Sequence, residues 1–203
     1  DMSQTEREAI DAGTVVVGAP GDDEYGSRSG AAWVFGNTDR GWSMIQKLRP
    51  ADASAGIRFG SSVSVRADRI AVGAPEDGSV GASSGAVFVF RSVAGLWTLE
   101  EKLVAPDGRA GAQFGWSVAL ADNAIVICAP ADASHGRNTG SAYLFRIDGG
   151  RWTFDAKLSA ADGLIAGNAK RKAKSLWTEN EDGPPVRVLE HEDAVPDADP
   201  QGA

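Results

Sequence analysis

The sequence predicts an all-β protein built from three copies of one four-stranded unit. Whole columns of residues recur every 55 positions without insertion or deletion, as the Ala-Pro pairs at 19–20, 74–75 and 129–130 show. Short apolar segments alternate with turns rich in Gly and Ser, and no segment sustains the apolar spacing of a helix. A fixed period of this length marks an array of one supersecondary unit.

The strands of the unit can be placed in the second copy, residues 59–113. The first and last segments, FGSSVSV and LWTLEEKL, alternate apolar and polar residues, which indicates one solvated face. The two middle segments, RIAVGAP and GAVFVF, are almost continuously apolar, which indicates burial on both faces. We expect four strands, at residues 59–65, 69–75, 85–90 and 96–103.

Four antiparallel strands whose middle pair is buried on both faces are typical of a β-propeller blade, because stacked blades cover one another. The units run from about 4–58, 59–113 and 114–168. Closed propellers usually have four to eight blades, so three blades predict an incomplete propeller. Either the chain is part of a larger propeller, or it self-associates through open blade faces.

Two recurring motifs resemble a known repeat. Phe-Gly at 59–60 and 114–115, with Val-Gly-Ala-Pro at 17–20 and 72–75, resembles the FG-GAP repeat of the integrin alpha-subunit propeller and of many bacterial surface proteins. The third copy of the second motif has Cys128 in place of Gly. The resemblance implies a binding or adhesion module, extracellular or at the cell surface, with a protein or carbohydrate ligand.

The integrin-type repeat often carries a calcium loop between its first and second strands, and here those turns do not support one. They read Asp11-Ala12-Gly13, Arg66-Ala67-Asp68 and Ala121-Asp122-Asn123. These turns are too short and too poor in carboxylates to give calcium six to eight oxygen ligands. We therefore expect no cofactor and no metal at these turns; the alternative that stays open is calcium at the acidic loop Asp22–Glu24.

Composition narrows the classes of partner. The formal net charge is −8, and residues 175–203 alone hold eight acids and one arginine. The rest is therefore close to neutral, which predicts no basic face and no nucleic-acid partner. No apolar run is long enough to span a membrane, and the single cysteine excludes an intrachain disulfide. Residues 169–203 form a charged, Pro-rich tail for which this composition predicts disorder.

The candidate binding residues lie in the loops after each Gly-Ala-Pro, which differ most between units. Asp22, Asp77 and Asp132 recur there, and each could cap its turn or contribute to a rim of acids for a cation or basic ligand. The first loop is the most acidic. The candidate set is Asp22, Asp23, Glu24, Asp77, Asp132, His135 and Arg137.

The other conspicuous residues favour structural roles. We expect the recurring Trp42, Trp97 and Trp152 to pack against neighbouring blades, and Cys128 to be buried. No nucleophile motif accompanies His135, so the sequence predicts a non-catalytic protein. Two alternatives stay open: a hydrolase that uses the loop carboxylates, or a non-functional fragment of a larger protein.

Overall fold

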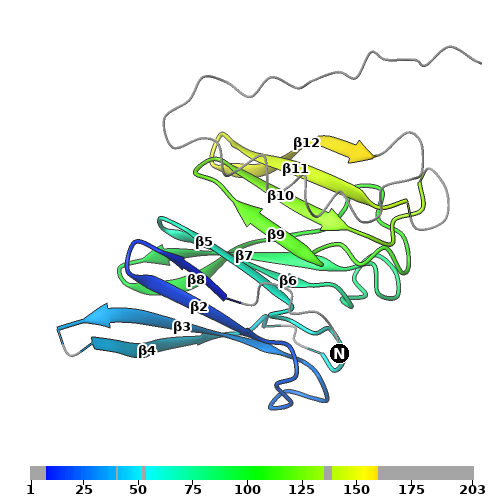
Figure 1. Cartoon of the computed structure of the whole chain (residues 1–203). Helices are drawn as coiled ribbons and strands as arrows, with labels where there is room; N and C mark the ends of the chain where they lie inside the picture. The colour runs from blue at the N-terminus through cyan, green and yellow to red at the C-terminus, as the bar shows by residue number, and fades with distance from the viewer. Residues whose placement is uncertain (1–7, 40, 52–53, 135–138, 160–203) are drawn as a thin grey trace, which may run out of the picture.

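A computed structural model describes residues 8–39, 41–51, 54–134 and 139–159 of the chain. Within those ranges the protein contains strands and no helix, in three four-stranded antiparallel sheets, which confirms the predicted all-β fold (Figure 1). The first sheet contains β1 (Glu8–Asp11), β2 (Thr14–Ala19), β3 (Ala31–Thr38) and β4 (Gly41–Leu48). The second contains β5 (Ser62–Arg66), β6 (Arg69–Ala74), β7 (Ala86–Val93) and β8 (Leu96–Leu103). The third contains β9 (Ser117–Leu120), β10 (Ala124–Ala129), β11 (Ser141–Asp148) and β12 (Arg151–Ser159).

Each sheet is a meander whose strands pair in chain order. The pairing repeats so closely that the register between the third and fourth strands shifts at the same place in every sheet, where the fourth strand has one extra residue: Ile45, Glu100 and Asp155. One expectation was wrong in detail: the first strand of the second unit begins at Ser62, three residues after Phe59. Gly60 has a φ of +88°, and this left-handed turn separates the Phe-Gly pair from the strand.

The three sheets stack face to face (Figure 1), and β5 contacts β1 and β2 on one side and β9 on the other. We call the face of a sheet that packs on the preceding sheet its proximal face, and the opposite face its distal face. Alternate residues of each middle strand point to the two faces. In β6, for example, Ile70 and Val72 belong to the core shared with the first sheet, whereas Ala71 belongs to the core shared with the third. Stacking therefore buries both sides of the middle sheet, as a propeller blade requires.

The phenylalanine of each Phe-Gly pair anchors its blade. Phe59 is buried, and its ring packs edge-on against Phe88 and Phe90, with centroids 5.4 and 6.1 Å away. Phe114 repeats this arrangement with Tyr143 and Phe145 at 5.3 and 6.2 Å. Such edge-to-face pairs add stabilisation beyond the apolar area that they bury.

Glycine is required where neighbouring sheets touch. A Cβ atom on Gly18 would lie 2.1 Å from the carbonyl oxygen of Gly60, and one on Gly73 would lie 2.0 Å from that of Gly115. The Gly of Gly-Ala-Pro in one blade thus meets the Gly of Phe-Gly in the next, and no side chain fits between them. Cys128 stands in the same column of the third sheet and is buried, as predicted.

The tryptophan column also packs as predicted wherever a preceding sheet exists. Trp97 and Trp152 lie in the cores between sheets. Gln46 in the first sheet brackets the backbone of Trp97: its amide nitrogen donates to the Trp97 carbonyl at 2.8 Å, and its oxygen accepts from the Trp97 N–H at 2.9 Å. Trp42 has no preceding sheet in the described structure and is exposed.

Candidate ligand-binding loops

The three predicted loops leave the same end of their sheets, between the second and third strands. They are residues 20–30, 75–85 and 130–140, of which 135–138 lie outside the described residues. The segment that leads to the next blade lies beside each of the first two loops. Gly56 donates to the Ser27 carbonyl at 2.8 Å, and Gly111 repeats this bond with Ala82 at 2.8 Å. These loops therefore rest on a backbone support rather than projecting freely.

The recurring aspartates hold the loops together. The backbone N–H of Glu24 donates to Asp22 Oδ1 at 3.2 Å, and that of Ser79 donates to Asp77 Oδ1 at 2.9 Å. Each aspartate carbonyl accepts the N–H of the glycine that precedes the third strand. This geometry fits the alternative in which the recurring aspartates cap their turns.

Each aspartate also pairs with a lysine 25 residues further on, which lies on the fourth strand of the same sheet. Lys47, Lys102 and Lys157 approach Asp22, Asp77 and Asp132 to 2.8, 2.9 and 2.8 Å. Asp77 and Asp132 are buried, and Asp22 is only partly exposed. Of the predicted rim, the recurring carboxylates are thus turned inward onto lysine rather than outward to solvent.

The surroundings keep these carboxylates ionised. Burial alone would raise the pKa of Asp132, but hydrogen bonds from Lys157, Ser134 and Ser141 lower it to about 2. The pKa of Asp77 is also lowered, since hydrogen bonds from Ser79 and Lys102 outweigh the effect of burial. In the first loop, the hydrogen bond from Lys47 is the main cause that lowers the pKa of Asp22.

Exposed charged and aromatic side chains are concentrated in the first loop. Asp23, Glu24 and Tyr25 are exposed side by side, and the guanidinium of Arg49 lies 4.0 Å from the centre of the Tyr25 ring. Glu24 pairs with Lys47, and Asp23 accepts the backbone N–H of Arg28 at 2.6 Å. Acidic, aromatic and basic groups therefore share one surface.

His135 and Arg137 lie outside the described residues. Over the ranges that the structure covers, no group of three or more His, Cys, Asp or Glu side chains is placed to hold a metal ion. The expectation of no calcium stays a prediction.

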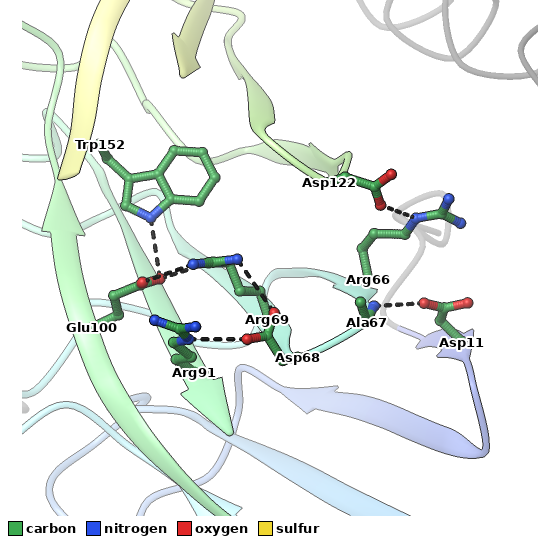
Figure 2. Close-up of polar contacts among 9 residues, drawn as sticks. All are labelled: Asp11, Arg66, Ala67, Asp68, Arg69, Arg91, Glu100, Asp122 and Trp152. Carbon is green, nitrogen blue, oxygen red and sulfur yellow. Dashed lines mark hydrogen bonds and ion pairs between the residues drawn. The ribbon is translucent and has the colours of Figure 1, made fainter. Parts of the chain in front are cut away.

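At the other end of the sheets, the first turns interlock with one another (Figure 2). Asp11 accepts the N–H of Ala67 at 2.6 Å, and Arg66 donates to Asp122 at 2.9 Å. Each contact joins one blade to the next, so protein groups fill these turns.

A second set of contacts at this end crosses from the second sheet to the third (Figure 2). Arg69 forms two hydrogen bonds with Glu100, at 2.9 and 3.1 Å, and a third with Asp68 at 3.2 Å. The indole N–H of Trp152 donates to the same Glu100 at 3.2 Å. Sequence reasoning missed this cluster, because Arg69 and Trp152 belong to different repeats and share no column.

Two further sets of polar contacts, made by the lysine column and by Asp107, did not follow from the sequence. The lysine column was visible as Lys-Leu at 47–48, 102–103 and 157–158, but its pairing with the aspartates needed the fold. Asp107 lies in the connection after the second sheet, and its carboxylate accepts from Tyr143 at 2.8 Å and pairs with Lys157 of the next blade.

The stacked sheets, with loops supported at one end, define a propeller-type repeat scaffold. The family model of the FG-GAP repeat matches residues 9–35, 42–90 and 97–145. Because these segments make up more than half of the chain, the protein belongs to the FG-GAP repeat family. No curated protein matches the chain. Across the described ranges, no helix has the length and apolar character needed to cross a membrane.

Proposed function

We propose that this protein is a non-catalytic binding module that acts extracellularly or at a cell surface. It presents the loops after Gly-Ala-Pro, and above all residues 21–30 with Arg49, to a protein or carbohydrate ligand. The fold and the family are compatible with a propeller scaffold for binding or adhesion. In such scaffolds, binding residues concentrate on loops that a rigid framework positions.

The recurring and the non-recurring residues of the loops differ in exposure, and this difference carries the proposal. The residues that recur in every blade, such as Asp77 and Lys102, are engaged with each other. The residues that do not recur, Asp23, Glu24 and Tyr25, are exposed on the loop that the next blade supports. An exposed tyrosine beside acidic and basic groups suits hydrogen bonding and ring stacking with a sugar or a polar protein surface.

The hydrolase alternative gains no support from the carboxylates. A general acid needs a pKa near the working pH, which enzymes obtain by raising the pKa of a carboxyl group. Here the pKa of Asp132 is lowered to about 2 and that of Asp77 is lowered as well. FG-GAP repeat proteins are also typically non-catalytic.

The proposal can be tested on immobilised glycans and extracellular matrix proteins. We expect the wild-type protein to bind at least one of them, and Tyr25→Ser or Asp23→Ser to weaken that binding about tenfold or more, equivalent to about 1.4 kcal/mol. Asp148→Ser is the matched control, since Asp148 is exposed at the opposite end of β11. Binding that survives both loop variants, or no binding to any probe, would contradict the proposal.

A further inference from the structure

The distal face of the third sheet is buried at its centre, although no strand of the described ranges lies over it. Val126 and Cys128 on β10 are each 5% exposed, and Ala142 on β11 is 7% exposed. They form an apolar cluster whose described members all belong to β10 and β11. Val15 and Val17, on the proximal face of the first sheet that no described strand covers, are by contrast only partly buried. The burial of the cluster therefore calls for a covering element that the described strands do not supply.

The cover does not extend over the whole of this face. Leu158 on the outer strand β12 pairs with Ala142, lies on the same face and is 52% exposed. Its counterparts Leu48 and Leu103, which the next sheet covers, are 1% and 3% exposed. A further regular blade would bury Leu158 in the same way. The face is thus covered at its two middle strands and open at β12, as expected for a short segment rather than a four-stranded sheet.

The close contact that joins one regular blade to the next is also lost at this face. Where the second sheet meets the third, a Cβ atom on Gly73 would lie 2.0 Å from the carbonyl oxygen of Gly115. One unit further along the chain, both glycines are replaced: Cys128 stands in the column of Gly73, and Lys170 stands 55 residues after Gly115. A regular Phe-Gly contact is therefore excluded here by the side chain of Cys128 and is absent from the sequence that follows.

The chain leaves the third sheet beside the buried cluster. Strand β12 ends at Ser159, which pairs with Ser141 next to Ala142. Neighbouring strands lie about 4.8 Å apart and an extended chain advances about 3.3 Å per residue, so about five residues reach from β12 across β11 to β10. Residues 160–177 contain two pairs of large apolar residues, Leu-Ile at 164–165 and Leu-Trp at 176–177. Residues 178–203 instead contain eight acids and one arginine.

We propose that residues 160–177 cover the distal face of the third sheet and cap the stack in place of a regular blade. Their apolar pairs pack on the cluster of Val126, Cys128 and Ala142. The disorder predicted for residues 169–203 is then confined to the acidic part, whose charge disfavours burial on an apolar face. This inference does not depend on the proposed ligand loops, which lie at an end of the sheets rather than on this face.

The rate at which iodoacetamide labels the full chain tests the proposal. Cys128 is the only cysteine, so the label reports on this face alone. A buried thiol reacts only when its cover opens, so the wild-type protein labels slowly. Removing the apolar pairs speeds labelling about tenfold or more. This variant is Leu164→Ser/Ile165→Ser/Leu176→Ser/Trp177→Ser. The matched control replaces four apolar residues of the acidic part and labels as slowly as the wild type. It is Val186→Ser/Val188→Ser/Leu189→Ser/Val195→Ser.

Four outcomes would overturn the proposal. Wild-type labelling as fast as in urea shows that the face is open, and equal rates in the wild type and the first variant show that other residues cover it. Fast labelling of the control assigns the cover to the acidic part. A wild-type rate that rises on dilution shows that a second copy covers the face. Circular dichroism checks that each variant is folded, and Leu176→Ser/Trp177→Ser repeats the test with two changes if the first variant does not fold.

Discussion

At the scale of single residues, Asp132 makes the stability of the third blade depend on pH. Its pKa of about 2 lies below the ordinary 3.8, so ionised Asp132 stabilises the folded state above about pH 4. This contribution is lost as pH falls from about 4 through about 2. The difference in pKa corresponds to about 2 kcal/mol.

We therefore expect Asp132→Asn to lower the free energy of unfolding near neutral pH by about 2 kcal/mol and to flatten its decline in acid. Urea denaturation at several values between about pH 6 and pH 2 measures both effects. An unchanged slope in the variant would show that Asp132 does not carry the acid dependence.

The glycine contact between blades gives a second prediction at this scale. Gly73→Ala places a Cβ atom 2.0 Å from the Gly115 carbonyl oxygen, so the second and third sheets must move apart. We expect a loss of about 3 kcal/mol in the free energy of unfolding. Gly21→Ala is the control, because no atom lies within 4 Å of a Cβ placed there. Equal losses in the two variants would argue against the close approach of the sheets.

At the scale of elements, the Phe-Gly segment should be the anchor of each blade. Phe114→Ala removes a buried ring that contacts Tyr143 and Phe145, and such truncations cost about 3–5 kcal/mol. Phe154→Ala also removes a ring that contacts these two residues, but Phe154 is exposed and should cost much less. Thermal denaturation of both variants gives the comparison, and similar losses would contradict the anchoring role.

The strands of each blade could be predicted because their apolar pattern is local and is repeated three times. Almost continuously apolar segments such as residues 70–74 point apolar side chains to both faces, and the pattern alone indicates that both are covered. The start of the first strand could not be predicted. Phe59 has the same parity as Val63 and Val65, so the strand could equally begin at Phe59 although Ser61 interrupts the alternation. The left-handed turn at Gly60, which lies close to Ala31 of the neighbouring sheet, is visible only in the structure.

At the scale of the whole molecule, most contacts between repeats could not be predicted from the sequence. The period identifies equivalent positions but not which columns meet. The pairing of Gln46 with Trp97, or of Arg69 with Glu100, follows from how the sheets are offset when they stack. The candidate loops lie between the second and third strands of each sheet, and their role in binding stays a prediction. That their recurring aspartates bind lysine became clear only from the fold.

Consecutive repeats of this protein stack so that one blade covers the next. Hydrogen exchange at the Trp97 amide tests this stacking most directly, since this N–H donates to Gln46 of the preceding blade, 51 residues away. We expect slow exchange in the wild-type protein and faster exchange in Gln46→Ala. The Trp152 amide, held by Glu101, should be unchanged in that variant. A Trp97 amide that exchanges as fast as an exposed amide, whatever residue stands at 46, would contradict the stacked arrangement.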